Sequence, residues 1–577
     1  MTFLSIDSLR NRTFDAIVVG SGISGGWAAK ELTGHGLRTL VLERGRDVRH
    51  VTDYPTTMMN PWEFPHGRHL TTETRQTSPI VSRCQAFNED SAHFFVKDAE
   101  HPYVQEKPFD WIRGYQVGGK SLLWARQTQR WSPYDFDGPA RDGFAVPWPI
   151  GYDDLAPWYG YVEKFAGISG NKDGLPHLPD GEFLPPHEQS CVEAHFSQQM
   201  ARHYGGTRPV IIGRCAHLTS PQPVHFEQGR GQCQNRNLCQ RGCPYGGYFS
   251  SNAATLPWAA RTGKLTLRPD SVVHSLIFDE KKGKATGVRV VDAHTKQTTE
   301  YFAKIIFVNA AALNTNLILL NSISNRFPNG LGNDNGLLGR YVAFHNYRTS
   351  ITAEYEGFLD KTTEGIRPNM SYIPRFRNVF RQETSGPASR FLRGYAAGFR
   401  AGRPALTQAP GFGEELKQTL LQTRYGPWRV HSHMMGETIP KVDSFVALDP
   451  VRKDPWGIPQ LRISVGYDEN DENMMADYHE QLTEMFTKAG FTNITTHDDT
   501  TKAPGLDIHE MGGVRMGHDP KTSLLNRWNQ LHACPNVFVT DGACMTSTAT
   551  QNPSLTYMAL TARAADYAVQ ELKKKNL

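Results

Sequence analysis

Apolar and polar positions in the first fifty residues follow a pattern that predicts a strand, a helix and a second strand. Ala16 to Val19 form an apolar run of strand length, and Thr39 to Leu42 form a second one. Between them, Ser24 to Leu32 have helical character, and glycines fill the short turn before this segment. Short apolar runs bounded by glycine are typical of buried strands. The pattern therefore predicts a strand–turn–helix unit followed by a second buried strand.

Three glycines of the turn, Gly20, Gly22 and Gly25, have the GxGxxG spacing of a dinucleotide-binding fingerprint. The first permits the tight turn, the second lets a pyrophosphate approach the backbone, and the third allows close packing of helix on strand. Glu43 follows the second strand, where a carboxylate accepts hydrogen bonds from a ribose diol and repels a 2′-phosphate. The fingerprint predicts a bound dinucleotide and does not distinguish FAD from NAD.

Later parts of the chain show two further patterns. Three runs have strand character and would complete the nucleotide-binding domain: Leu265–Phe278, Gly287–Val291 and Lys304–Val308. Residues 342–504 combine strand-like alternation, as in Ser444–Leu448 and Leu461–Val465, with one amphipathic helix, Asp471–Ala489. This combination predicts an antiparallel sheet backed by helices. Residues 51–106 are polar and lack a sustained period, which predicts a long excursion serving as a lid, a contact segment or a covering loop.

Charge and composition exclude several classes of protein. The 577 residues include 62 basic and 58 acidic ones, and the only long basic run is Lys573 to Lys575 at the end, so no nucleic-acid partner is indicated. The apolar runs have the length of core strands, so no membrane-spanning segment is predicted. Met1 to Phe14 lack the pattern of a signal peptide. By itself, the sequence predicts a cytoplasmic protein.

Four motifs, in chain order, resemble the glucose-methanol-choline (GMC) flavoprotein oxidoreductases. They are the fingerprint with Glu43, the turn Gly118-Gly119-Lys120-Ser121, the segment His509–Gly517, and Thr540–Ala543 followed by Asn552-Pro553-Ser554. This resemblance implies FAD rather than NAD. It also implies an α/β fold in which a Rossmann-type FAD-binding domain is interleaved with an α+β substrate domain built on an antiparallel sheet.

On this basis we expect a discontinuous division of the chain. The FAD-binding domain would comprise residues 1–50, 107–150, 255–341 and 505–577. The substrate-binding domain would comprise 151–254 and 342–504, including a cysteine-rich segment at 231–246, and residues 51–106 would form the excursion.

The resemblance also implies which residues contact FAD. They are Gly20, Gly22, Gly25, Glu43, Arg44, Gly118, Gly119, Ser121, Trp124, Ala125, Val273, Asp541, Asn552 and Pro553. Relatives that attach the flavin through a histidine have Thr-His-Trp after the Gly-Gly-x-Ser turn, whereas this chain has Leu122-Leu123-Trp124. Because Leu123 cannot form that bond, we expect FAD to be bound non-covalently.

A histidine and an asparagine near the end of the chain are the candidate catalytic residues. The family places a His/His or His/Asn pair at two positions that correspond here to His509 and Asn552. Histidine suits a general base at neutral pH because its ordinary pKa is near 6.5. We expect His509 to accept the hydroxyl proton and Asn552 to orient the substrate from the start of a helix. Within 342–504, polar contacts to a hydroxylated ligand are expected from Arg429, His431, His433 or Glu437, each of which also has a structural interpretation.

Three of the eight cysteines, Cys233, Cys239 and Cys243, lie within eleven residues. With Pro244 after the last, they resemble the iron-sulfur segment of membrane-linked FAD sugar dehydrogenases. Closely spaced thiolates favour an iron-sulfur cluster or zinc. Three ligands suit a [3Fe–4S] cluster, and a zinc site would need a fourth ligand from outside the segment. A disulfide or free thiols are the structural alternative.

Within the family, the chain most resembles the catalytic subunit of bacterial glucoside 3-dehydrogenases. This implies oxidation of the C3 hydroxyl of glucose or a glucoside, with electrons passed to an external acceptor such as a cytochrome and with a small accessory subunit as partner. Oxidation at C1 or C2 by another sugar or polyol dehydrogenase or oxidase is the alternative, and a flavin-binding scaffold without turnover is a second one. Related subunits are exported with a partner that carries a twin-arginine signal, so the periplasm is a second possible compartment.

Overall fold

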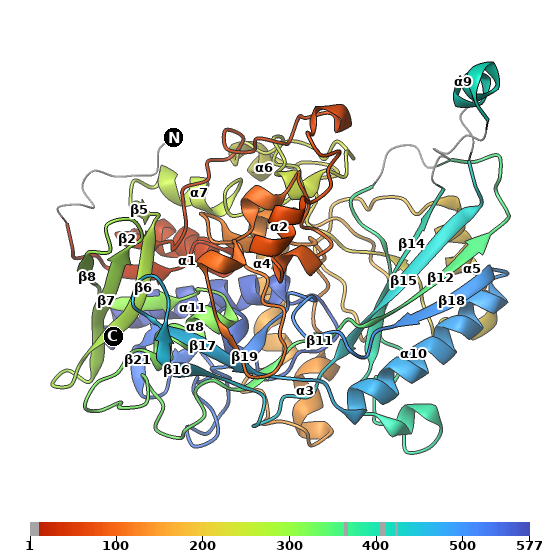
Figure 1. Cartoon of the computed structure of the whole chain (residues 1–577). Helices are drawn as coiled ribbons and strands as arrows, with labels where there is room; N and C mark the ends of the chain where they lie inside the picture. Colours follow the sequence, from red (N-terminus) through yellow and green to blue (C-terminus); the bar gives the residue numbers. More distant parts are fainter. Residues whose placement is uncertain (1–10, 363–366, 404–410, 422–424) are drawn as a thin grey trace.

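A mostly parallel sheet of six strands carries the glycine fingerprint (Figure 1). In this computed structural model, which describes residues 11–362, 367–403, 411–421 and 425–577, the sheet has the order β20-β21-β9-β1-β2-β5. Residues 1–10, the start of the segment inspected for a signal peptide, lie outside the described residues. The strands are β1 (Ala16–Val19), β2 (Thr39–Leu42), β5 (Leu265–Arg268), β9 (Ile305–Val308), β20 (Gln530–Leu531) and β21 (Cys534–Phe538). Both predicted strands at the start of the chain are confirmed with the same bounds.

Both faces of this sheet are covered, as its fully apolar strands require: helices pack on one face, and a small antiparallel sheet packs on the other. Helix α1 (Ile23–Gly34) follows β1 and packs beside α7 (Thr255–Arg261) and the long C-terminal helix α11 (Ser554–Lys573). Helix α4 (Tyr152–Ala166) also contacts α11, and α8 (Ala312–Leu320) follows β9. The sequence predicted the first of these helices to within two residues at either end.

Two smaller sheets flank this core. Strands β6 (Ser271–Asp279), β7 (Lys284–Asp292) and β8 (Thr298–Phe302) form an antiparallel sheet of three. Five strands form the other, in the order β19-β10-β16-β17-β3: Met511–Gly513, Arg340–Ala343, Phe445–Lys453, Pro459–Ser464 and Val104–Gln105. The predicted strands at 444–448 and 461–465 therefore exist, but they do not belong to the large antiparallel sheet with which they were grouped. Alternation identifies a strand but not its partner.

The large antiparallel sheet lies on the opposite side of the molecule (Figure 1). Its path is β18-β12-β15-β14-β13-β4, and β11 also pairs with β15. The bounds are β4 Ile211–Ile212, β11 His345–Asn346, β12 Thr349–Tyr355, β13 Ser371–Ile373, β14 Tyr395–Gly402, β15 Trp428–Glu437 and β18 Thr492–Asp498. Helices α10 (Glu469–Lys488) and α5 (Cys191–Tyr204) pack on one face through a shared apolar cluster. The α/β part and the α+β part of the predicted fold are both present.

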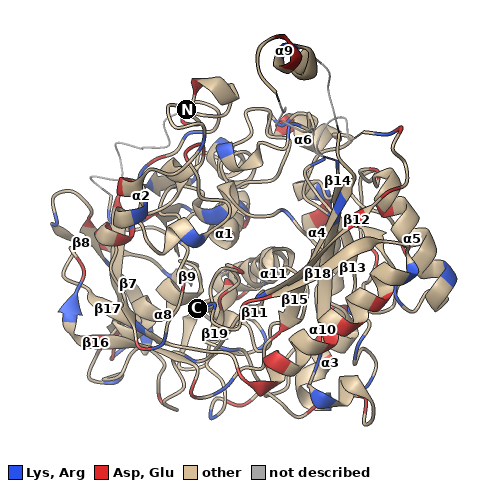
Figure 2. Cartoon of the chain, turned by 45° about the vertical axis from the view of Figure 1, so that its right-hand side comes forward, with Lys and Arg blue, Asp and Glu red and all other residues tan. Residues whose placement is uncertain are grey.

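Residues 51–106 contain only short helices and turns before β3, which fits the predicted excursion. The remaining helices of the described ranges are α2 (Thr72–Thr77), α3 (Pro133–Arg141), α6 (Pro223–Glu227) and α9 (Gly413–Leu421), and eight short 3-10 turns fall between elements there. In the view of Figure 2, acidic and basic residues are interspersed over the elements. None of the helices in the described ranges combines the length and the apolar character needed to span a bilayer.

A buried ion-pair network joins the large sheet to α3. Arg393 Nε donates to Glu437 Oε2 at 2.9 Å, and an Nη1 atom of the same arginine donates to Asp142 at 2.8 Å. Arg375 lies 3.3 Å from Glu437 and 3.4 Å from Asp135. Since all these side chains are buried, each charge depends on its partners for compensation.

We therefore predict that Glu437→Gln lowers the free energy of unfolding by about 3–5 kcal/mol, because it leaves two buried guanidinium groups undercompensated. The matched control is Glu354→Gln, which removes a pair with the exposed Arg429 at 4.0 Å and should change stability by less than about 0.5 kcal/mol. Urea unfolding followed by fluorescence measures both. Equal midpoints for the two variants would contradict the prediction.

Candidate functional site

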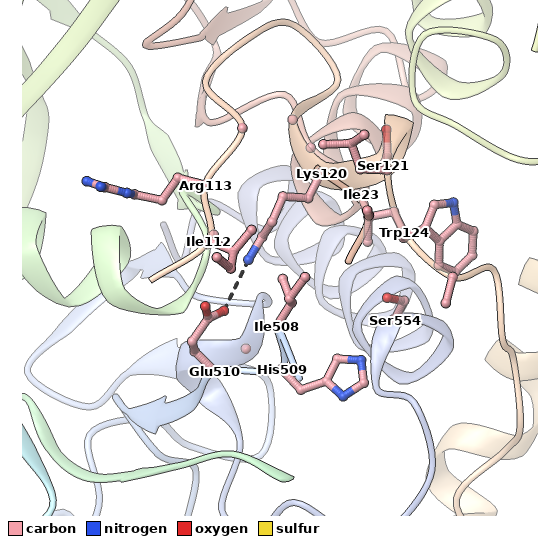
Figure 3. A pocket seen from close by; sticks show the side chains of 18 of the residues that line it. Ile23, Ile112, Arg113, Lys120, Ser121, Trp124, Ile508, His509, Glu510 and Ser554 are labelled. Carbon is pink, nitrogen blue, oxygen red and sulfur yellow. Dashed lines mark hydrogen bonds and ion pairs between the residues drawn. The ribbon is translucent and has the colours of Figure 1, made fainter. Parts of the chain in front are cut away.

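A central cavity of about 800 Å³ opens where the parallel strands β1, β2 and β9 end. Parts of the chain that are far apart in sequence meet there, including the fingerprint, the 118–126 turn, the 506–510 segment and the start of α11 (Figure 3). Of the residues predicted to contact FAD, twelve line this cavity: Gly20, Gly22, Glu43, Arg44, Gly119, Ser121, Trp124, Ala125, Val273, Asp541, Asn552 and Pro553. The candidate base, His509, lines it as well.

The other two predicted residues, Gly25 and Gly118, shape the wall from behind. A Cβ atom at Gly25 would lie 1.9 Å from the carbonyl oxygen of Gly20, so only glycine lets α1 pack against the turn. At Gly118 (φ +89°), a Cβ would lie 1.6 Å from Asn252 Oδ1. The N–H of Gly118 donates to Ser21 Oγ at 2.9 Å, which links the second turn to the fingerprint.

Three helix N-termini meet at this cavity. Helix α1 begins after Gly22, α8 after Ala311 and α11 after Pro553, and these residues line the cavity. None of the three N-cap residues accepts a side-chain hydrogen bond from the first turn. Uncapped N-termini leave backbone N–H groups and positive dipole ends without protein partners, which suits an anionic ligand.

Glu43 is buried at the floor of the cavity and holds the fingerprint turn in place. Its Oε2 atom accepts hydrogen bonds from the Ser21 hydroxyl (2.6 Å) and the Ser21 N–H (3.1 Å), and Oε1 accepts one from the Gly45 N–H (3.1 Å). Burial raises the pKa of this carboxyl. A carboxylate has about four acceptor positions, so one remains for a ribose hydroxyl.

Arg44 and Asp541 are anchored by their own contacts. The guanidinium of Arg44 pairs with Asp454 at 3.1 Å and lies over the rings of Tyr115 and Trp456. Asp541 accepts hydrogen bonds from Thr315 Oγ1 (2.6 Å) and the Ala543 N–H (3.0 Å), and burial raises its pKa to about 6. Both side chains are thus rigid parts of the cavity wall.

His509 lies between a second histidine and Asn552. Its Nε2 atom is 3.3 Å from Asn552 Nδ2, and its Nδ1 atom is 2.9 Å from Nδ1 of His345, a residue of β11. His345 Nε2 lies 3.2 Å from the carbonyl oxygen of Thr548 and 3.0 Å from that of Ala549. The structure thus brings together the two residues that the sequence singled out, and it adds a third, His345, which the sequence did not indicate.

These contacts determine the proton positions on both rings. The two carbonyl oxygens only accept hydrogen bonds, so His345 Nε2 carries a proton. In the neutral ring, His345 Nδ1 is then an acceptor, and Nδ1 of His509 must donate to it. His509 Nε2 is therefore unprotonated and accepts from the amide of Asn552. A neutral imidazole, hydrogen-bonded to Asn552, thus lines the cavity.

The electrostatic surroundings favour this neutral form. Burial, with smaller contributions from His345 and Lys120, holds the pKa of His509 well below its ordinary value, and burial lowers that of His345 to about 4. Lys120 pairs with Glu510 at 3.1 Å, directly beside His509 (Figure 3). His345, Asp507 and His509 also lie close enough together to bind a metal ion, but the Nδ1 atoms of the two histidines are already hydrogen-bonded to each other.

One face of the large antiparallel sheet forms the far wall of the cavity. In β15, Val430 and Met434 face α10, so the intervening His431 and His433 face the cavity, as the two-residue period of a strand requires. Arg400 of β14 lines the cavity beside them. Two expected contacts are wrong: Glu437 belongs to the buried ion-pair network, and Arg429 is exposed and pairs with Glu354.

A second, smaller cavity of about 30 Å³ is lined by Cys233, Cys239 and Cys243, together with His217, and we call it the cysteine cavity. Asn237 and Leu238 line both cavities, so the two share a wall. All eight cysteines lie in the described ranges, and none forms a disulfide. The three sulfur atoms are not among the groups of described ligands whose atoms all lie within 4.8 Å of one another.

Two buried arginines lie near the cysteine cavity. Neither Arg126 nor Arg230 forms an ion pair with any described carboxylate. Arg230 Nη2 and Arg126 Nε and Nη1 are buried without hydrogen-bond partners. Burial raises the pKa of Cys233 and of Cys239, and the nearby positive charge of Arg126 opposes this shift at both thiols. Because buried charges are normally paired, the two guanidinium groups suit a negatively charged group at the cysteines.

Sequence reasoning missed three residues of this region: His345, Arg126 and His217. His345 lies in a two-residue strand, and its contact with His509 spans 164 residues of chain. No sequence pattern distinguishes Arg126 from other arginines, because its burial without a carboxylate partner results from packing. The close spacing of the cysteines could have prompted a search for a histidine within their segment. His217 lies outside that segment, so such a search would not have found it.

Comparison with protein families resolves the identity of this arrangement. The GMC oxidoreductase N-terminal family model matches residues 14–345, more than half of the chain, and the C-terminal one matches residues 440–561. The chain belongs to the GMC oxidoreductase family. Both matches include the segments that form the central cavity, and the predicted fold class is confirmed.

Similar proteins of this family cover nearly the whole chain. The chain is 28% identical to 2-methyl-1,2-propanediol dehydrogenase of Mycolicibacterium austroafricanum, with 96% of this chain and 94% of the relative covered. It is 27% identical to the fructose dehydrogenase large subunit of Gluconobacter japonicus (97% and 98% covered). A solved structure of Aspergillus oryzae formate oxidase shares the fold, with a TM-score of 0.60, 13% identity and coverage of 98% and 99%.

The cofactor of the family is FAD, and the central cavity fits it. The uncapped N-terminus of α1 suits the pyrophosphate, and Gly20 and Gly22 leave the approach to the backbone free. The remaining acceptor position of Glu43 suits a ribose hydroxyl. The N-terminus of α11 lies beside His509, where a positive dipole end stabilises negative charge on a reduced flavin.

We predict that the protein releases its flavin on acid precipitation, because Leu123 lines the cavity without a nucleophilic atom to hold the flavin. After centrifugation, the supernatant should be yellow and the washed pellet colourless. Absorbance spectra of both fractions measure this. Flavin colour that persists in the washed pellet would contradict non-covalent binding.

Proposed function

We propose that this protein is an FAD-dependent dehydrogenase that oxidises a secondary hydroxyl of a sugar or glycoside. The observation that carries the proposal is the unprotonated His509 Nε2 facing the cavity beside Asn552. The names of several relatives support a hydroxylated substrate: fructose dehydrogenase, paromamine 6'-oxidase and gluconate 2-dehydrogenase. A wall with His431, His433 and Arg400 offers polar contacts to such a ligand.

Three residues would take part in removing the hydroxyl proton of the substrate. FAD, when bound, accepts the hydride from the substrate carbon. His509 Nε2 accepts the hydroxyl proton as general base, and Asn552 Nδ2 donates a hydrogen bond that orients the substrate oxygen. His345 acts as a positioning residue, because it accepts a hydrogen bond from His509 Nδ1 and so holds His509 in the tautomer with an unprotonated Nε2.

We predict that His509→Ala slows anaerobic flavin reduction by about 10²–10⁴-fold while FAD stays bound, since this is the typical contribution of a general base. Asn552→Ala should cost less, because it removes an orienting hydrogen bond only. Stopped-flow absorbance with saturating sugar measures both rates. Reduction of the His509→Ala variant at the parental rate would refute the assignment.

The pH profile of flavin reduction distinguishes a positioning role of His345 from a general loss of structure in the variant. A base acts when deprotonated, so the lowered pKa of His509 puts the acid limb of flavin reduction below pH 6.5. In His345→Phe, the Nδ1–H partner is lost, and the reduction rate should fall without loss of FAD. An unchanged rate and profile in His345→Phe would show that the tautomer does not depend on His345.

We further propose that oxidation takes place at C3 of glucose and glucosides. The resemblance to glucoside 3-dehydrogenases supports this position, and oxidation at C1 or C2 is the alternative. Oxidation at C1 requires a free anomeric hydroxyl, whereas oxidation at C2 or C3 does not. Glucosides, which lack that hydroxyl, are therefore the decisive substrates.

With an artificial electron acceptor, NMR should identify a 3-keto product from both glucose and a methyl β-glucoside. The glucoside cannot form a lactone because its C1 oxygen is substituted. Lactone from glucose, with the glucoside unreacted, would establish oxidation at C1 instead. A 2-keto product would likewise overturn the C3 proposal.

We propose that Cys233, Cys239 and Cys243 bind an iron-sulfur cluster of the [3Fe–4S] type, through which electrons leave. Zinc–sulfur bonds of about 2.3 Å would require sulfurs roughly 4 Å apart, and the three sulfurs are not all that close. Ligands of a cluster bind different irons and lie farther apart. The unpaired charges of Arg126 and Arg230 suit a cluster held by three thiolates.

The iron proposal predicts about three irons per chain in anaerobically purified protein and an electron paramagnetic resonance signal from the cluster. Cys243→Ser should lose both, and Cys534→Ser, which removes a buried cysteine of β21, should keep both. Absence of iron, with rapid hydrogen peroxide formation in air, would indicate an oxidase with structural cysteines.

Partners and compartment follow from the same proposal. One relative is named as a large subunit and another as a flavoprotein, which supports a small accessory subunit and a cytochrome or similar electron acceptor. Cytoplasmic location and export to the periplasm with a signal-bearing partner are both compatible with this proposal. We also propose the division into FAD-binding, substrate-binding and excursion segments given by the sequence.

A further inference from the structure

A second group of potential metal ligands lies behind the cysteine cavity. His187, Cys215 and His217 are all buried, and one ligand atom from each lies within 4.8 Å of the other two. Metal–nitrogen and metal–sulfur bonds of about 2.0 and 2.3 Å place ligand atoms roughly 3–4 Å apart, so this spacing suits one ion. None of these three residues has a role in the proposed oxidation.

The backbone holds this group in place through several bridges. Cys215 pairs with both Gln127 and Ser169, and His217 pairs with Tyr248. The rings of His187 and His217 are 6.0 Å apart between centroids and nearly perpendicular, at 74°. The Cys215 thiol has only the Ser169 hydroxyl, at 3.3 Å, as a side-chain partner among the described residues. Such a preformed arrangement needs little reorganisation to bind an ion.

Two ring nitrogens of this group are buried without any partner. They are Nε2 of His187 and Nδ1 of His217. Buried polar atoms are almost always hydrogen-bonded or coordinated, so each orphan calls for an explanation. Burial also holds the pKa of His187 at about 4 and that of His217 well below its ordinary value. Both imidazoles are therefore neutral at neutral pH and have a lone pair available for a metal.

The charges around the group restrict the kind of ion. The guanidinium of Arg126 lies over the ring of Tyr248, which packs against His217. Burial lowers the pKa of His217, and the charges of Arg126 and Arg230 lower it further, whereas no carboxylate belongs to the group. A set of two neutral imidazoles and one thiolate carries one negative charge. A divalent ion would leave a net positive charge beside two buried arginines, whereas a monovalent ion gives a neutral complex, which is less costly to bury. Imidazole and thiolate are also ligands that copper prefers.

We propose that His187, Cys215 and His217 bind a single copper(I) ion. On binding, the Cys215 thiol loses its proton to solvent and forms the copper–sulfur bond, and the two imidazoles complete a three-coordinate site. The site does not depend on the proposed substrate or on an iron-sulfur cluster.

His217 would connect this site to the cysteine cavity. Its Nε2 atom lies 3.8 Å from Cys239 Sγ, so with Nδ1 on copper, the Nε2–H would point to that sulfur. A ligating histidine normally donates its other N–H to a neighbouring acceptor, and a cysteine sulfur is the acceptor present here. Copper binding therefore orients a hydrogen bond toward the proposed electron exit.

The test uses the full-length flavoprotein, loaded anaerobically with copper(I) in competition with bicinchoninate and then desalted. We expect one copper per chain in the parent protein and in Cys243→Ser, which changes only the cysteine cavity. Cys215→Ser and His187→Ala should each lose the copper. Copper K-edge absorption should show one sulfur and two nitrogen neighbours in the parent.

Flavin content shows whether each variant is folded, and His187→Gln replaces any variant that loses FAD. Copper lost from Cys243→Ser but kept by Cys215→Ser would place it at the cysteine cavity and overturn the proposal. Absence of retained copper in the parent would also overturn it, as would retention of zinc in preference to copper. Because Cys243→Ser lacks a ligand of the proposed iron-sulfur cluster, failure of that cluster and failure of the copper site give different results.

Discussion

The convergence of three positive helix ends on one edge of a parallel sheet is the constraint on which the rest of the structure depends. Parallel strands run in one direction, so the helices that follow them begin at the same edge. Helices α1, α8 and α11 begin there after β1, β9 and β21, and none has a side-chain cap. Without an anionic ligand or water, their first N–H groups would lack partners. The large antiparallel sheet and the wall shared with the cysteine cavity enclose this edge.

Several strained backbone positions lie at or near the same cavity. Five non-glycine residues that line it have left-handed φ angles, and Ala549 (53°) lies behind His345; the five are Arg68 (70°), Arg126 (65°), Asn237 (51°), Ala311 (71°) and Ile508 (62°). Each costs about 1–3 kcal/mol, and a β-branched residue such as Ile508 is especially unfavourable. Several of these strained residues stand next to functional parts of the cavity. Ala311 starts α8, Ile508 precedes the candidate base, and Ala549 provides a carbonyl oxygen to His345. The well-packed core around them supplies the compensating stability.

The sequence predicted those features that short spacings determine. The turn between β1 and α1, Glu43, and the pairing of His509 with Asn552 are local motifs or belong to a recognisable order of motifs. Features made by long-range contacts were not predictable. His345 meets His509 only after β11 pairs with β15, and β16 and β17 pair with β10 and β3 rather than with the large sheet. Likewise, the sequence does not distinguish Arg126 and Arg230 from exposed arginines, because their burial without carboxylate partners arises from tertiary packing.

The hydrogen-bond chain behind His509 limits where a proton can travel in the proposed reaction. The chain passes from His509 Nδ1 to His345 and ends at the carbonyl oxygens of Thr548 and Ala549, which are not bases near neutral pH. The lowered pKa of His345 also disfavours a second proton on that ring. A proton taken up at His509 Nε2 therefore stays on the cavity side and leaves by the opening that admits substrate. Electrons would leave in another direction, through the wall formed by Asn237 and Leu238 toward the cysteines. Separate exits would allow the protein to pass single electrons to a carrier without moving the proton through its core.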